Sequence, residues 1–258
     1  AAWRLCELVV CHFRVPKNRP ARISKKTFES LYAKGAADTQ DSYKEKFGQL
    51  EWTTEETKDG ESTEYLYGTL KESPGEWVPF PIEHTQIWRT WLAAGADTAV
   101  YDKPPMEALS ELKELDNERY YQPMMNEVGD ASLRRIAREL SSILVFDYLT
   151  NNWDRFVTDE ERYGVNNPFA DGHFVSINNG TAFQRRASTR VKGRFGWTDR
   201  FSRSTIASLE LLDRDFVDTA LYPEQSADAR GKLSVFWDQR DRALERIDKL
   251  KARYGEET

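Results

Sequence analysis

Residues 133–155 read LRRIARELSSILVFDYLTNNWDR, an apolar helical pattern that runs into a short polar motif. The apolar positions recur at the spacing of one helix face, which predicts a helix from Leu133 to Leu149. These positions are Leu133, Ile136, Leu140, Ile143 and Leu144. The motif Asn152-Trp153-Asp154-Arg155 follows directly, so the carboxylate of Asp154 is expected just past the end of the helix.

A second polar motif follows a strand-like run. Residues Gly172 to Ile177 alternate as a strand does and lead into Asn178-Asn179-Gly180, where Gly180 permits a tight turn. Phosphoryl transfer from ATP needs a carboxylate that orients the acceptor hydroxyl, and acidic ligands that hold Mg²⁺ against the phosphates. The two motifs fit these parts in order. As bare patterns, however, Asp-Arg is more often a surface ion pair and Asn-Asn-Gly a hairpin tip.

Length and composition set outer limits. A chain of 258 residues can bury one large core or two small ones, and eight Trp with 39% apolar residues indicate a folded globular protein. No apolar run approaches the roughly 18 residues of a membrane span, so none is predicted. The net charge of −6 argues against nonspecific binding to nucleic acid or to an anionic membrane.

The two cysteines are expected on one helix, from Ala2 to Phe13. Cys6 and Cys11 would then point in different directions, which predicts no disulfide. Together with three scattered histidines they give no zinc pattern. Cysteine usage therefore favours a bacterial or cytoplasmic setting.

Charge is unevenly distributed along the chain. Residues Glu51 to Glu64 are mostly acidic. Within them, Asp59-Gly60 lies between Thr- and Tyr-rich runs and predicts the tip of a β-hairpin that spans Phe47 to Leu70. The simplest interpretation is a hairpin exposed to solvent. Residues Arg185 to Arg203 are basic, with aromatic side chains interleaved.

Helices dominate the remaining expected elements. Pro16 and Pro20 end the first helix, and Pro74, Pro79 and Pro81 predict an extended loop that reaches Trp88 and Trp91. The further helices are expected at Lys25 to Lys34, Met106 to Leu115, Ser204 to Leu212, Arg214 to Leu221, and in a C-terminal amphipathic segment ended by Gly255.

Residues 143–155 and 174–183 together resemble the catalytic region of the four-jointed and Golgi casein kinase family of secretory-pathway kinases. That family has a helix ending Phe-Asp-Phe/Tyr-Leu, then Asn-x-Asp-Arg, then a strand into Asp-Asn-Gly-x-x-Phe. The N-terminal helix with its Arg14-Val15-Pro16 turn is also similar, and the later helices fit the family's C-terminal lobe in order, so the resemblance spans most of the chain.

The resemblance assigns roles residue by residue. It makes Asp154 the catalytic carboxylate, Asn178 the occupant of the metal-ligand position, and Gly180 a nucleotide-site residue. Asp159 stands where the family has an acidic residue of the metal or nucleotide site, although a solvated loop acid is the alternative. Arg155 is expected to brace the loop rather than to touch substrate.

Two departures from the family pattern bear on activity. Asn178 supplies a neutral amide where the family has a carboxylate, which weakens a site for Mg²⁺ or Mn²⁺; it is either the natural residue of a pseudokinase or an engineered replacement. If Ala1 to Phe13 matches the family's helix, the glycine-rich strands and nucleotide-binding lysine would lie upstream of residue 1. The small lobe would then be incomplete.

The basic stretch follows the metal motif, where a kinase positions its substrate. Arg185, Arg186 and Arg190 are therefore expected to attract an acidic protein or glycan substrate, or a phosphate group. The equally weighted alternative is a solvated loop whose arginines pair with surface acids. Seven bases within an acidic chain make a poor nucleic-acid footprint.

The sequence thus predicts one α+β, mainly helical domain over residues 1–258: a kinase-like C-lobe at 131–258 preceded at 1–130 by a small-lobe remnant and a β-hairpin insertion. The expected function is ATP-dependent transfer to a hydroxyl of protein Ser/Thr or of a sugar, with this chain inactive or impaired. A pseudokinase that serves an active kinase as allosteric partner or scaffold is the alternative, and a module binding acidic ligands is a third. For the cellular location, the family resemblance favours the secretory pathway, whereas the cysteines favour a bacterial or cytoplasmic setting.

Overall fold

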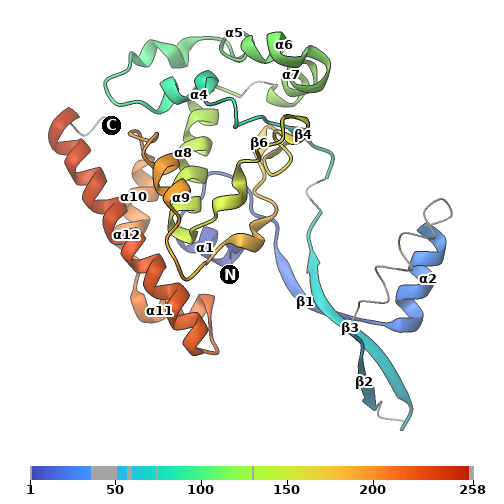
Figure 1. Ribbon diagram of the computed structural model, residues 1–258. Helices are drawn as coiled ribbons and strands as arrows, with labels where there is room; N and C mark the ends of the chain where they lie inside the picture. The colour runs from blue at the N-terminus through green and yellow to red at the C-terminus, as the bar shows by residue number, and fades with distance from the viewer. Residues whose placement is uncertain (1, 36–50, 57–59, 74, 130, 256–258) are drawn as a thin grey trace. The chain divides into compact units, whose positions relative to one another are not determined.

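The computed structural model describes residues 2–35, 51–56, 60–73, 75–129 and 131–255, and has an α+β, mainly helical fold (Figure 1). The structure confirms the predicted α+β, mainly helical class. The kinase-like C-lobe stays a prediction. The chain divides into two compact units. The larger comprises residues 1–16 and 74–258, and the smaller residues 17–73.

The smaller unit is an antiparallel sheet with one helix. Its elements are β1 (Asn18–Ser24), α2 (Lys25–Gly35), β2 (Thr53–Glu56) and β3 (Ser62–Lys71), with strand order β1-β3-β2. Strands β2 and β3 pair as the predicted hairpin, with Thr53 opposite Tyr65. The expected tip residue Asp59 lies outside the described residues. Helix α2 confirms the helix predicted from residue 25.

Strand β1 is a feature that the sequence prediction lacks. Pro20 lies within it and would ordinarily indicate a break, but β1 is an edge strand, and edge strands tolerate proline because one row of their backbone groups has no strand partner. Arg22 of β1 forms an ion pair with Glu55, and Lys25 forms one with Glu64 at 2.7 Å. Two acids of the hairpin are thus paired rather than simply solvated.

The larger unit is built around helix α8 (Leu133–Thr150), shown in yellow-green in Figure 1. The other helices of four residues or more are α1 (Ala2–Leu8), α4 (Thr85–Leu92), η1 (Thr98–Asp102), α5 (Pro105–Ala108), α6 (Glu111–Asp116), η2 (Asn117–Tyr121), α7 (Gln122–Val128), α9 (Thr189–Phe195), α10 (Arg203–Glu210), α11 (Arg214–Leu221) and α12 (Ala227–Tyr254). A small antiparallel sheet has the order β4 (Val78–Pro79), β5 (Pro168–Ala170), β6 (His173–Phe174).

Helix α8 is the predicted helix, and it is buried on nearly all sides. Ser132 caps its start by accepting from the N–H of Arg135, and every residue from Leu140 to Thr150 is buried. Such all-round burial is typical of a core helix. Near its end Tyr148 stacks on Phe195 of α9, with ring centroids 4.1 Å apart. The end of α8, where the first polar motif begins, is therefore rigidly surrounded.

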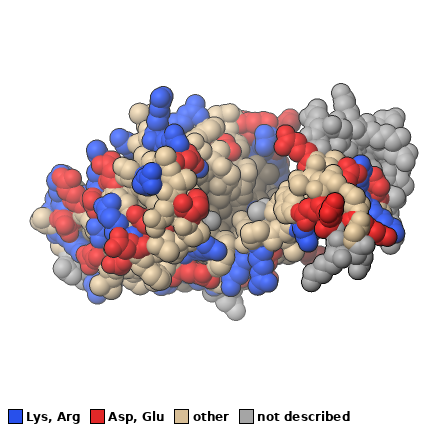
Figure 2. All heavy atoms as spheres, turned by 90° about the horizontal axis from the view of Figure 1, so that it is seen from below, with Lys and Arg blue, Asp and Glu red and all other residues tan. Residues whose placement is uncertain are grey.

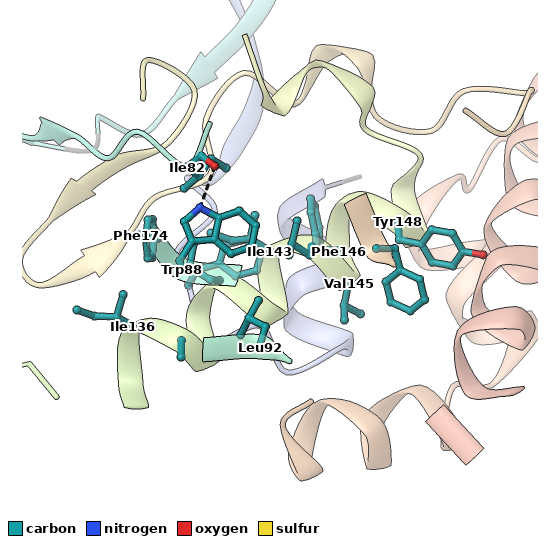
Figure 3. Packing of buried hydrophobic residues seen from close by; sticks show 14 of the residues in the cluster. Ile82, Trp88, Leu92, Ile136, Ile143, Val145, Phe146, Tyr148 and Phe174 are labelled. Carbon is teal, nitrogen blue, oxygen red and sulfur yellow. Dashed lines mark hydrogen bonds between the residues drawn. The ribbon is translucent and has the colours of Figure 1, made fainter. Parts of the chain in front are cut away.

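Trp88 and Trp91 correct one prediction. They belong to helix α4 and not to an extended loop, and both are buried. Figure 3 shows Trp88 among Ile136, Ile143 and Phe174, with its indole N–H donating to the carbonyl of Ile82 at 2.9 Å. The bond satisfies the polar atom of a deeply buried ring, so tertiary burial rather than the preceding prolines decides this segment.

The cysteines correct another prediction. Helix α1 ends at Leu8 instead of reaching Phe13, so Cys11 lies past the helix, and Cys6 and Cys11 form a disulfide with Cα atoms 5.1 Å apart. Beyond the helix, Arg14 forms a parallel bridge with Val175. The prediction of no disulfide is therefore wrong, and cysteine usage no longer favours a bacterial or cytoplasmic setting, since disulfides persist in oxidising surroundings.

Other boundaries differ in detail. The helix expected at Met106 to Leu115 is broken into α5 and α6 around the buried Leu109. The strand expected at Gly172 to Ile177 narrows to β6. Helices α10, α11 and α12 lie where helices are predicted, and Gly255 at φ 89° ends α12. Within the described residues, no helix is long and apolar enough to cross a membrane.

The disulfide is expected to contribute to stability by closing a short loop in the unfolded chain. Loop-closure entropy for a separation of five residues corresponds to about 2 kcal/mol. Urea unfolding of the Cys6→Ser/Cys11→Ser variant should show a loss of about that size, and reductant should weaken the wild-type protein but not the variant. Equal sensitivity of both proteins to reductant would contradict this role.

Candidate active site

The first motif is positioned by the way α8 ends. Asn151 takes the left-handed conformation, φ 56° and ψ 36°, which asparagine tolerates better than most residues, and so terminates the helix. Its side chain then holds the basic stretch: its Oδ1 accepts from the N–H of Ser188 at 2.8 Å and its Nδ2 donates to the carbonyl of Arg186 at 2.5 Å. A short 3₁₀ turn, η3 (Trp153–Arg155), carries Asp154.

Arg155 forms a buried ion pair with Asp147 in the last turns of α8. Its Nε and Nη2 donate to both carboxylate oxygens at 2.9 and 2.8 Å, and the side chains are 0% and 7% exposed. Nη1 donates to the carbonyl of Asn166 at 3.0 Å, and Nη2 also to the hydroxyl of Ser176 at 2.7 Å. The guanidinium thus joins three segments, which confirms that Arg155 braces the loop.

Asn179 joins the second motif to the first. Its Oδ1 accepts from Arg155 Nη2 at 3.2 Å, from Asn152 Nδ2 at 3.3 Å and from the hydroxyl of Ser176 at 3.0 Å. Thr181, in the turn η5 (Asn179–Thr181), donates to Asn152 Oδ1 at 2.5 Å. The two motifs recognised in the sequence are therefore side by side.

Asn166 links Asp154 to Asn178, and the sequence reading missed it because it stands outside both motifs. Its Nδ2 donates to the main-chain carbonyl of Asp154 at 2.8 Å, and its Oδ1 accepts from Asn178 Nδ2 at 3.0 Å. A carbonyl can only accept, so Asn166 must turn its Nδ2 toward Asp154 and its Oδ1 toward Asn178. In this arrangement Asn178 is the donor, a role that an ionised carboxylate could not take.

The carboxylate of Asp154 is half-buried and, among the described residues, has no hydrogen-bond or ion-pair partner. Gly180 differs from expectation. Its φ is not positive and a Cβ built there would meet nothing within 4 Å, whereas Asn178 takes the left-handed conformation at φ 55°. The turn therefore depends on Asn178 and leaves open space beside Gly180.

Asp159 has a local role in the structure. It is exposed, and its Oδ1 accepts from the N–H of Glu161 at 3.1 Å, which caps the turn η4 (Glu160–Arg162). The structure gives it no contact with Asp154 or Asn178, and its assignment to a nucleotide site stays a prediction.

The basic stretch separates into residues with different surroundings. Arg185 and Arg186 line a hollow of about 530 Å³ together with Trp153 of the first motif, and Arg185 also pairs with Asp228 of α12 at 2.7 Å. Arg190 is exposed on α9 and does not line this hollow. On the face shown in Figure 2, basic and acidic side chains are interspersed rather than gathered into one patch.

Arg194 is a residue of that stretch whose role the sequence did not reveal. Its Nη1 donates to the carbonyl of Trp153 at 2.8 Å, and its guanidinium lies 4.2 Å from the ring centroid of Phe156. Burial lowers the pKa of this guanidinium below its ordinary value. Arg194 thus holds the first motif from the other side.

Glu83 anchors the loop that follows Asp154. Its two carboxylate oxygens accept from the N–H groups of Val157 and Gly164 at 3.2 and 3.1 Å. Gly164 has φ +77°, and a Cβ there would come within 2.8 Å of the backbone N of Phe80, so only glycine fits. Burial raises the pKa of the Glu83 carboxyl, against the opposing effect of these two donors.

The residues near Asp154 do not fit a resident divalent cation. Nowhere in the part of the chain that the structure describes do three Cys, His, Asp or Glu side chains gather as metal ligands. Asn178, at the expected ligand position, brings no charge, and its Nδ2 is bound to Asn166. Hard cations such as Mg²⁺ prefer carboxylate oxygens, so these side chains form a poor donor set for a metal held by the protein alone.

No family model, curated protein or solved structure matches the chain. The resemblance to a kinase family therefore stays a prediction from the two sequence motifs.

We expect Arg155→Ala to lower the free energy of unfolding by about 3–5 kcal/mol, because it leaves the buried carboxylate of Asp147 without its partner. Urea unfolding measures the loss. Arg14→Ala is a matched control, since Arg14 pairs with Asp171 at 3.4 Å on the surface and such pairs contribute about 0–1 kcal/mol. Similar losses in both variants would contradict the bracing role.

Glu83 should impose a pH dependence of known sign. Because its pKa is raised in the folded state, the folded protein holds a proton that the unfolded chain has released above about 4.5, and its contribution to stability falls as pH rises. The stability of wild type relative to Glu83→Gln should therefore decrease from pH 4.5 towards 7, as urea unfolding at several pH values would show.

Glu245 provides the opposite control. Its hydrogen bond and ion pair with Lys249 lower its pKa, so the stability of wild type relative to Glu245→Gln should rise with pH over the interval in which Glu245 ionises. A rise with pH for Glu83 as well would rule out burial as the dominant influence on that carboxyl.

Proposed function

We propose that the chain is a phosphotransferase domain related to the four-jointed and Golgi casein kinase family, and that it is inactive or impaired as it stands. The observation that carries this proposal is the hydrogen-bonded network in which Arg155 and Asn179 join the two motifs of the resemblance. Motifs that matched by chance would have no reason to be connected through a buried guanidinium.

In this proposal Asp154 orients the acceptor hydroxyl and takes its proton. Its carboxylate is half-buried and has no partner within the described residues, so it is available to a hydroxyl, while Arg155 and Arg194 fix its loop. The hollow beside Trp153, with Arg185 and Arg186, suits an acidic protein or a glycan carrying the acceptor hydroxyl. ATP and Mg²⁺ or Mn²⁺ are the cosubstrate and metal that the resemblance implies.

Asn178 favours a second candidate, a pseudokinase that serves an active kinase as partner or scaffold. The bond from Asn178 to Asn166 uses the amide as a donor, and the carbonyl of Asp154 dictates that orientation. A turn fitted to an amide in this way supports Asn178 as the natural residue rather than as an engineered lesion. An aspartate there would place two acceptors against each other.

The test is a transfer assay with labelled ATP and Mn²⁺ or Mg²⁺ on wild type, Asn178→Asp and Asn178→Ala. We expect Asn178→Asp to transfer phosphate at least about tenfold faster than wild type, equivalent to about 1.4 kcal/mol in the barrier. Asn178→Ala should stay inactive, and Asp154→Asn should abolish the gain. Nucleotide binding is measured in parallel by calorimetry.

The outcomes separate the two candidates. If Asn178→Asp folds, as judged by its unfolding transition, and neither binds nucleotide nor transfers phosphate, residues 1–258 do not catalyse phosphoryl transfer by themselves and the scaffold candidate stands. If the faster transfer of Asn178→Asp is retained when Asp154→Asn is added, Asp154 does not act in the transfer, although the metal-dependent reaction itself would remain.

A further inference from the structure

A strongly basic cavity lies on the larger unit, away from the two motifs. It has a volume of about 700 Å³ and lies between the first half of α8, the region of η1 and the start of α10. Four arginines line it, namely Arg134, Arg138, Arg200 and Arg203, and no carboxylate does. Asp154, by contrast, follows the opposite end of α8.

Two of these arginines are held in place by an aromatic ring. Arg200 donates from Nη1 to the hydroxyl of Tyr101 at 2.9 Å and lies over its ring at 5.3 Å, while Arg134 lies over the same ring at 5.1 Å. The positions of both charges are thereby fixed. Both guanidinium groups would compete with a nucleobase for stacking on this ring.

The other two arginines have no partner. Within the described residues, Arg138 and Arg203 form no hydrogen bond, ion pair or ring contact, and both are exposed to the cavity and solvent. Two unpaired guanidinium groups facing one hollow provide donors for an anion from outside the chain.

Hydroxyl groups complete the donor set. Ser202 and Ser204 stand at the start of α10 and hydrogen-bond each other at 2.8 Å, and Nε2 of His12 lies 2.7 and 3.1 Å from their hydroxyls. Ser202 makes no side-chain capping bond to the helix. The helix dipole adds a further positive field at this end, which acts together with the guanidinium groups.

We propose that this cavity binds the phosphate group of a phosphorylated serine or threonine in a protein partner. Forked guanidinium groups match the oxygens of a phosphate monoester, whose charge at neutral pH is close to −2. The cavity is much larger than phosphate alone, so the group that carries the phosphate enters too. The two guanidinium groups over the ring of Tyr101 favour a peptide over a nucleotide as that carrier. This inference is independent of the proposed function.

The test is a titration of the full chain with a labelled Gly-Ser-Gly peptide, phosphorylated or unmodified, followed by fluorescence anisotropy. Saturable binding of the phosphopeptide alone is expected, weakened at least tenfold in Arg138→Gln/Arg203→Gln. Both positions are exposed, so the variant should unfold like wild type. Arg214→Gln/Arg242→Gln, with the same change of net charge on exposed positions of α11 and α12, should bind like wild type.

Three results would overturn the proposal. Equal weakening in the α11/α12 control variant would show that only net charge matters. Undiminished binding in Arg138→Gln/Arg203→Gln would place the phosphate elsewhere. Tighter, equally arginine-dependent binding of adenosine monophosphate than of the phosphopeptide would identify the carrier as a nucleotide.

Discussion

The ion pair between Asp147 and Arg155 determines where the polar segments of the larger unit can lie. An ionised aspartate inside a buried helix is costly unless both of its oxygens are satisfied, and Arg155 satisfies both. Its remaining donors reach Asn166 and Ser176. Because guanidinium is planar and forked, these acceptors can occupy only a few relative positions, and a lysine at 155 could not replace it.

The orientations of the side-chain amides of Asn166 and Asn178 depend on that arrangement. Once Asn166 is held by Arg155 and faces the carbonyl of Asp154, its remaining oxygen must accept, and Asn178 supplies the donor. The neighbourhood of Asp154 is in consequence rich in neutral amides and poor in negative charge. These neutral amides explain why the side chains around Asp154 make a poor donor set for a divalent cation.

The arginines between residues 185 and 203 show how one basic segment serves several purposes. Arg194 is half-buried against Phe156 and supports the loop of Asp154, and Arg185 is tied to α12 through Asp228. Arg200 and Arg203 instead belong to the cavity at the start of α10. Sequence proximity grouped these charges, but the chain folds around α8 and turns them toward different surfaces.

Periodicity and capping by themselves determined α8, α11 and the end of α12 at Gly255, since these depend on contacts within a few residues along the chain. The two polar motifs, and the expectation that Arg155 braces the loop, also came from sequence. The disulfide, strand β1, the helical state of Trp88 and the role of Asn166 did not. Most of these depend on partners distant in sequence: β1 pairs with β3, Trp88 packs against α8, and Asn166 gains its role only when Asp154 and Asn178 flank it. The disulfide instead depends on where α1 ends. Local patterns record which conformations a segment prefers, whereas tertiary structure decides which polar groups must satisfy one another.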